Sequence, residues 1–121
     1  MNCRYFPIFI LFFTFSCKKN SIDTFYIKNT SNKSITYTTS NLFPDTSIVQ
    51  ILNYKIINPG QLDGPFAYST SASGVVEVFL FDNNIFQTNT WDNVSKKYLI
   101  LKRYDLTKDS ISKMGGVITY Q

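Results

Sequence analysis

Few residues in this chain of 121 amino acids have side chains that commonly do chemistry. The chain has no histidine, and its two cysteines, Cys3 and Cys17, both lie near the N-terminus. Without an imidazole or a thiol further along, the usual nucleophile–base pairs and zinc-ligand sets cannot be assembled in the rest of the chain. We therefore predict that the protein is not an enzyme and that it has no catalytic residue, no metal site and no cofactor.

Carboxylate pairs are the remaining catalytic possibility, because a glycosidase needs only two suitably spaced acids. Most acids here fall in expected turns or in the first turns of expected helices, where local capping explains them. The segment from Asp82 to Asn84 groups oxygen ligands, but it lacks the full spacing of a calcium loop. The candidate carboxylates are Asp23, Asp45, Asp63, Glu77, Asp82, Asp92, Asp105 and Asp109.

Two other residues are candidates for contact with a glycan or a partner. Glu77 interrupts the apolar run from Val75 to Phe81, so it pairs with a cation, faces solvent at a sheet edge or contacts a ligand. Trp91 is the single tryptophan, and it either packs a short helix onto a sheet or offers its ring as a stacking platform. The sequence leaves these alternatives open.

Residues 1–16 have the composition of an export signal. Arg4 supplies one positive charge, and a nearly unbroken apolar run extends from Tyr5 to Phe15. This run is shorter than the roughly 20 residues that a membrane-spanning helix needs. A charged start followed by a short apolar centre is typical of secretory signals, and we predict a signal peptide over residues 1–16.

The end of the apolar run, Thr14-Phe15-Ser16-Cys17, resembles the lipobox of bacterial lipoproteins, with Phe15 where a small residue is common. The resemblance implies cleavage before Cys17 and acyl chains such as palmitate on that residue. Each buried methylene contributes about 0.8 kcal/mol, so two or more chains anchor a protein stably. Residues 17–21 would then be the lipidated cysteine and a tether. The alternatives are an ordinary secreted protein and a buried N-terminal strand.

The charge distribution argues against a nucleic-acid partner. The chain carries a net charge of +4. Removal of Arg4 with the signal leaves about +3, and two of those charges belong to Lys18 and Lys19 in the tether, so the folded body is close to neutral. Lys102 and Arg103 are neighbours on an expected strand and therefore point to opposite faces. No basic face for nucleic acid is indicated.

The remainder, residues 22–121, is typical of an all-β domain. Ile35 to Ser40 alternates apolar and polar residues as a half-buried antiparallel strand does. We predict an antiparallel sandwich, immunoglobulin-like in architecture, with about seven strands. Asn58 to Gln61 places Pro and Gly at the centre of a type II turn, and residues 62–74 are expected to form a loop. The expected strands are 24–29, 35–40, one long or two short strands within 48–61, 75–81, 98–106 and 116–120.

One or two short helices are predicted near the C-terminus. Thr90 is a suitable N-cap for a helix that includes Trp91, and the late lysines Lys96 and Lys97 agree with the helix dipole. Thr107 repeats this arrangement for a second helix, which the glycines at 115 and 116 would end.

The C-terminal segment carries a second resemblance. The run "YLILKRYDLT" (98–107), followed by "VITYQ", looks like a signature of small uncharacterised lipoproteins of Bacteroidetes-type bacteria. The segment "NTSNKSITYTTS" and the helix of Trp91 fit the same group. Gly115 and Gly116 depart from it, because relatives usually have an Asn-Trp pair there. The resemblance implies location and architecture, and it implies no activity.

Together these features predict a non-enzymatic lipoprotein of the cell envelope, which binds a protein or structural partner through sheet edges or loops. The alternative is a glycan-binding module that uses exposed aromatic residues such as Trp91. In lipoproteins of this type, acidic residues soon after the cysteine often mark export to the cell surface, and "CKKNSI" lacks them. We therefore expect a lipid anchor on Cys17 in the outer membrane, with the domain facing the periplasm.

Overall fold

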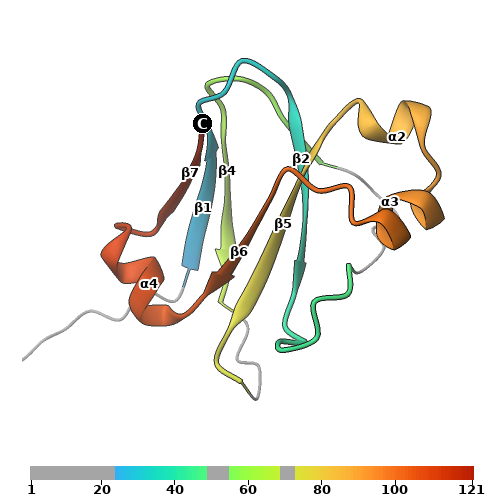
Figure 1. The fold of residues 1–121 in the computed structure, drawn as a ribbon. Coiled ribbons are helices and arrows are strands. Elements are labelled where there is room, and N and C mark those ends of the chain that lie inside the picture. The colour runs from blue at the N-terminus through green and yellow to red at the C-terminus, as the bar shows by residue number, and fades with distance from the viewer. Residues whose placement is uncertain (1–23, 49–54, 69–72) are drawn as a thin grey trace, which may run out of the picture.

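The computed structural model describes residues 24–48, 55–68 and 73–121. Two sheets face each other across a shared core, and three short helices lie at the ends and on one side of them (Figure 1). The predicted all-β sandwich with seven strands is therefore confirmed. The predictions for the signal peptide, Cys17 and the tether fall outside the described residues, and the immunoglobulin-like architecture stays a prediction.

The larger sheet has four strands in the order β3-β2-β5-β6, and every neighbouring pair is antiparallel. β5 therefore lies between two hydrogen-bonded neighbours, as its long apolar run predicts. The short β3 is the described part of the segment for which one or two strands were expected. The strands are β2 (Ile35–Ser40), β3 (Ile56–Ile57), β5 (Val76–Asp82) and β6 (Lys102–Leu106).

Two of the helices confirm the predicted capping. α3 (Trp91–Lys97) begins after Thr90, whose side chain accepts a hydrogen bond from the backbone of Asn93. α4 (Lys108–Lys113) begins after Thr107, and the side chains of Thr107 and Ser110 cap each other's backbone amides. A third helix, α2 (Ile85–Thr88), lies between β5 and α3 and was not predicted.

The smaller sheet has the order β4-β1-β7, formed by β4 (Leu62–Ala67), β1 (Thr24–Asn29) and β7 (Val117–Tyr120). β1 is antiparallel to β4 and parallel to β7. Among the described strands, the pair of β1 and β7 departs from the antiparallel pairing that the sequence predicted. It follows from the crossover through α4, which carries the chain from β6 in one sheet to β7 in the other.

The structure corrects two sequence predictions. The expected loop over 62–74 is wrong for Leu62–Ala67, which pairs with β1; Gly64, with φ +132°, fits a bulge where the register shifts. The expected strand 98–106 begins only at Lys102, because Tyr98 adopts a left-handed conformation (φ 53°) that ends α3. In the first case the pairing with β1 decided the structure, and in the second case the end of α3 decided it.

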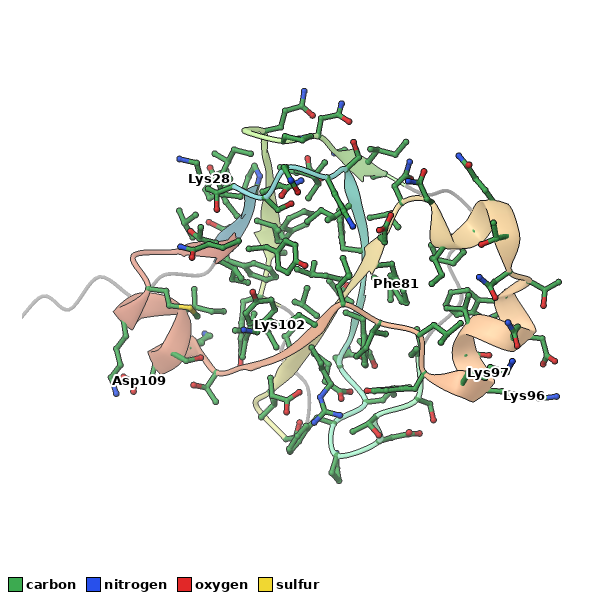
Figure 2. The ribbon with its side chains drawn as sticks, turned by 45° about the horizontal axis from the view of Figure 1, so that its top comes forward. Lys28, Phe81, Lys96, Lys97, Lys102 and Asp109 are labelled. Atoms are coloured by element: carbon green, nitrogen blue, oxygen red, sulfur yellow. The ribbon has the colours of Figure 1, made fainter. Side chains whose placement is uncertain are left out.

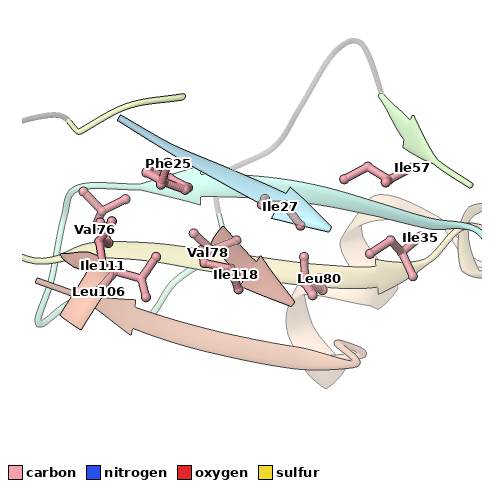
Figure 3. Packing of buried hydrophobic residues seen from close by; sticks show 10 residues of the cluster. All are labelled: Phe25, Ile27, Ile35, Ile57, Val76, Val78, Leu80, Leu106, Ile111 and Ile118. Atoms are coloured by element: carbon pink, nitrogen blue, oxygen red, sulfur yellow. The ribbon is translucent and has the colours of Figure 1, made fainter. Parts of the chain in front are cut away.

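An inner core fills the space between the two sheets (Figure 3). Its members come from alternate positions of the strands, since successive side chains of a strand point to opposite faces. Ile111 of α4 closes one end beside Val76 and Leu106. The inner core consists of Phe25, Ile27, Ile35, Ile57, Val76, Val78, Leu80, Leu106, Ile111 and Ile118.

Candidate functional site on the outer face of the larger sheet

The second face of β5 brings together the two residues that the sequence singled out downstream of the signal, since Glu77 belongs to β5 and Trp91 of α3 packs against that face. Val76, Val78 and Leu80 point into the inner core, so the intervening side chains point to the opposite, outer face. On that face Phe79 and Phe81 form a second apolar group, the outer cluster, with α2, α3 and the loop of residues 41–48. The outer cluster consists of Phe79, Phe81 and Val94, with the partly buried Ile48, Ile85, Phe86, Trp91, Leu99 and Ile100 packed against them.

Trp91 lies at the start of α3 and packs against the sheet. Its ring centroid is 6.3 Å from that of Phe81, at an interplanar angle of 62°, and 6.1 Å from that of Phe86, nearly parallel at 16°. Figure 2 shows Phe81 between β5 and the two helices, whereas Lys96 and Lys97 lie at the far end of α3. The packing interpretation of Trp91 is therefore confirmed, and a glycan or partner contact through the same ring stays a prediction.

Glu77 lies on the outer face at the other end of β5. It is opposite Ser40 on β2 and Asp105 on β6, and its side chain is fully buried. Within the described part of the chain, neither of its carboxylate oxygens has a hydrogen-bond partner. Because β5 is a central strand, the interpretation of Glu77 as a solvent-facing residue at a sheet edge is wrong.

Arg103 is the cation whose charge acts on Glu77, and its guanidinium already contacts two other side chains. Arg103 forms an ion pair with Asp105, with Nε 3.3 Å from Oδ1, and its terminal nitrogen donates to the hydroxyl of Tyr98 at 3.1 Å. Burial raises the pKa of Glu77 above its ordinary value of 4.5, and the charges of Asp105 and Asp45 raise it further, while Arg103 opposes them. The surroundings of this carboxyl therefore disfavour its charged form relative to that of an exposed glutamate.

Glu77 and Trp91 share a face without forming a single site. Phe79 lies between them on β5, and the four residue steps from Glu77 to Phe81 span about 13 Å. At the polar end, Ser40 of β2 lies opposite Glu77, and the charge of Asp45 in the loop of residues 41–48 acts on its carboxyl. The aromatic end at Trp91 lies under the helices.

Two surface hollows accompany these elements. The first, of about 630 Å³, opens at one end of the sandwich and is lined by residues of β1, β2, β4 and β5 together with Asn41 and Leu42. The second, of about 450 Å³, lies between the loop of residues 41–48 and α3. Both volumes are within the range of small-ligand pockets, but no carboxylate of the described residues lines either. The second hollow is lined by Thr46, Ser47, Ile48, Ser95, Lys96 and Tyr98.

The segment from Asp82 to Asn84 forms a turn, in which the amide of Asn84 donates to the Asp82 carboxylate at 2.9 Å. Within residues 24–48, 55–68 and 73–121, no group of three or more His, Cys, Asp or Glu side chains could hold a metal ion. Among the same residues, no helix has the length and apolar character needed to cross a membrane.

The roles of two polar residues in joining separate elements were not predicted from the sequence. The side-chain amide of Asn29 is fully buried and donates to the backbone oxygens of Lys33 (2.7 Å) and Ile57 (2.9 Å). Asp63 of β4 accepts a hydrogen bond from the Tyr37 hydroxyl (3.1 Å) and an ion pair from Lys55 (2.8 Å). Both residue types are common in turns, so no local pattern indicated their distant partners.

The pKa values of this polar group reflect its geometry. Burial, together with the neighbouring Asp63 carboxylate, raises the pKa of the Tyr37 hydroxyl well above its ordinary value of 10.0. Burial alone would raise the pKa of Asp63 as well, but hydrogen bonds from Lys55 and Tyr37 outweigh it and hold that pKa below 3.8. Asp63 is therefore stabilised as a carboxylate, in contrast to Glu77.

Comparisons with known proteins found no match for this chain among protein-family models, curated proteins or solved structures.

Proposed function

We propose that this protein is a non-enzymatic lipoprotein of the cell envelope, held by acyl chains on Cys17, and that its β-sandwich binds a protein partner. The family proposed for it is the group of small lipoproteins of Bacteroidetes-type bacteria that its C-terminal segment resembles. An immunoglobulin-like arrangement and a position in the outer membrane, facing the periplasm, belong to the same proposal.

The proposed lipid anchor is supported by the order of segments along the chain. An apolar run of signal type ends at Ser16-Cys17, and the first strand of the sandwich, β1, begins at Thr24. A lipid on Cys17 would therefore be followed almost at once by the folded body. The tether is short, so the domain would stay close to the membrane surface, where Lys18 and Lys19 favour anionic head groups.

The free edge of β7 is the part of the sandwich best suited to a partner strand. The carbonyls of Gly116 and Tyr120 accept hydrogen bonds at 2.8 Å from the backbone of β1 and the residue after it. Because bonding alternates along a parallel pair, the backbone groups of Val117 and Thr119 point away from β1. An extended peptide can add to such an edge, and its backbone hydrogen bonds then supply affinity.

The other three edges are less suited to strand addition. β6 carries the charged residues Lys102, Arg103 and Asp105, β4 contains Gly64 and Pro65 at its bulge, and β3 has two residues. Charges, proline and short length are the features that natural proteins use to block edge pairing. β7, with the sequence Val-Ile-Thr-Tyr, has none of the charges or prolines.

The anchor is tested by metabolic labelling with a palmitate analogue and by fractionation of membranes. We expect wild type to incorporate the label and to sediment with membranes, and Cys17→Ser to lose both properties. A Cys17→Ser protein that stays equally membrane-bound, or a wild-type protein that takes no label, would overturn the anchor.

The binding edge is tested separately by crosslinking in intact envelopes. Thr119→Pro removes an outward-facing amide without touching the bonds to β1, and Thr119→Val keeps that amide as a matched control. We expect a discrete crosslinked species with wild type and Thr119→Val, and its loss with Thr119→Pro. Equal crosslinking by all three proteins would exclude the β7 edge as the contact.

A further inference from the structure

The larger of the two surface hollows, of about 630 Å³, has no part in the β7 edge. We propose that this hollow binds one of the acyl chains on Cys17, while the rest of the lipid stays in the membrane. The inference rests on the lipid anchor of the proposed function, and it gives one chain of that anchor a place in the folded domain.

The hollow reaches the inner core at one end of the sandwich. Phe25 of β1 and Val76 of β5 line it, and both are almost fully buried at the same end of the core (Figure 3). Phe66, which also lines it, has its ring centroid 5.3 Å from that of Phe25 and 5.0 Å from that of Tyr37. An occupant of the hollow therefore meets apolar surface from both sheets, in a volume that suits a small ligand.

The lining favours an uncharged, apolar occupant. None of the residues that line the hollow is charged, so a charged ligand would lack a partner there. Leu42 lies in the lining and is 56% exposed, which is the largest exposed fraction among the large hydrophobic side chains of the described residues. Thr39, Ser40 and Asn41 add neutral polar groups, which suit the ester or amide group at the head of an acyl chain.

The tether enters the domain beside this hollow. Thr24, the first residue of β1, pairs with Ala67, which lines the hollow, and the next residue, Phe25, lines it as well. Seven residue steps separate Cys17 from Thr24, so even a fully extended tether reaches no more than about 25 Å. A chain on Cys17 is therefore held near the hollow at an effective concentration that a free lipid lacks.

The gain on binding comes from the hollow rather than from the chain. An acyl chain in the bilayer is already removed from water, so moving it into the hollow changes its own hydration little. The apolar surface of Leu42 and Phe66, in contrast, leaves water when the chain enters. Because the tether already restricts the chain, binding costs less translational entropy than binding of a separate molecule.

Metabolic labelling with a palmitate analogue that carries a photoreactive diazirine locates the chain in intact membranes. After irradiation and digestion of the full-length protein, mass spectrometry identifies the peptides that are joined. We expect the peptide that contains Cys17 to be joined to residues 39–42 or 65–67. A labelled phospholipid in the hollow would add its own mass to those residues without Cys17, and that product would overturn the proposal.

Two tryptophan variants of β4 separate the hollow from the rest of the domain. Ala67→Trp fills the hollow, whereas Leu62→Trp places the same side chain at the other end of the strand, outside the lining. Both positions are exposed, so we expect both proteins to fold, as far-UV circular dichroism checks. Ala67→Trp should lower the yield of the link about tenfold, and Leu62→Trp should keep the wild-type yield.

Thr39→Trp, at an exposed position of the β2 wall, is a second filling variant and decides the matter if Ala67→Trp fails to fold. A labelled Cys17 that links only to bilayer lipids, or equal links in wild type and in the filling variants, would overturn binding in the hollow and leave the anchor intact. A protein without label on Cys17 would overturn the anchor, and this inference with it.

Discussion

The two faces of β5 are both apolar, but they are covered in different ways. The inner face packs against β1 and β7, which lie far from β5 in the sequence, and its core members are all hydrophobic. The outer face is covered mainly by residues 85–100, which follow β5 directly, and by the end of the loop of residues 41–48. The buried carboxyl of Glu77 lies on the outer face.

This difference separates two tasks. The inner core joins the sheets, so its loss removes the reason for the sandwich to form at all. The outer layer is local in sequence and consists of two short helices and a loop, and elements of this kind open more readily than central strands. We infer that the outer layer can loosen while the sandwich persists, and the following predictions test that separation.

The largest effect is expected for Leu80→Ala on the inner side. Leu80 is fully buried between the sheets, and truncation of such a side chain costs about 2–5 kcal/mol of unfolding free energy. Urea denaturation followed by far-UV circular dichroism measures it. A loss of less than about 1 kcal/mol would show that the inner core is not the main source of stability.

The next largest effect is expected for Gly64→Ala in β4. An added Cβ would lie 2.9 Å from the backbone oxygen of Phe25, and φ is +132°. Gly60→Ala is the matched control, since Gly60 also has positive φ (+81°) but its Cβ would meet nothing within 4 Å. Thermal denaturation should rank Gly64→Ala as less stable than Gly60→Ala by about 1–3 kcal/mol. Equal losses of stability in the two variants would show that β1 and β4 can move apart at little cost to fit the added methyl group.

A smaller effect is expected for Val94→Ala on the outer side. Val94 is the buried residue of α3 in the outer cluster, and removal of its methyl groups should cost about 1–2 kcal/mol. Because the contact is local, the tryptophan fluorescence of the folded protein should change while the far-UV spectrum of the sheets stays the same. A loss as large as that of Leu80→Ala would contradict the separation of the two faces.

The smallest effect is expected for Asp63→Asn, at the joint between the sheets. The pKa of Asp63 lies below its ordinary 3.8, so its stabilisation is present above that value and is lost as the pH falls through the lowered one. Replacement should cost less than about 1 kcal/mol at neutral pH, because Lys55 is largely exposed. It should also flatten the acid limb of a stability profile. If the loss of stability at low pH were the same in Asp63→Asn and in wild type, other carboxylates would be responsible for it.

Much of the fold was predictable from sequence, because its signals are local. The caps at Thr90 and Thr107 act over three residues, and the alternation from Ile35 to Ser40 specifies which side chains face inward. The edge strand β4 was missed because Gly64 and Pro65 are typical of loops, and only its pairing with β1 makes it a strand. A sequence pattern does not contain that pairing.

The candidate site was predictable in part. The sequence singled out Glu77 as an exception, and it left Trp91 open between packing and a contact with a glycan or partner. The charges that act on Glu77 come from other segments of the chain. Asp105 lies opposite Glu77 through strand register, Arg103 lies opposite Phe79 on the same strand β6, and the charge of Asp45 acts from a loop. The role of Asn29 in joining two turns was likewise hidden, because its partners follow from the tertiary fold.

The most direct test of the separation compares two probes in one urea titration of wild-type protein. Trp91 is the single tryptophan and reports the outer cluster, while far-UV circular dichroism reports the sheets. The account predicts that the fluorescence transition comes at a lower urea concentration than the circular dichroism transition. Coincident transitions, in wild type and in Val94→Ala alike, would show that both faces of β5 unfold as one unit and would contradict it.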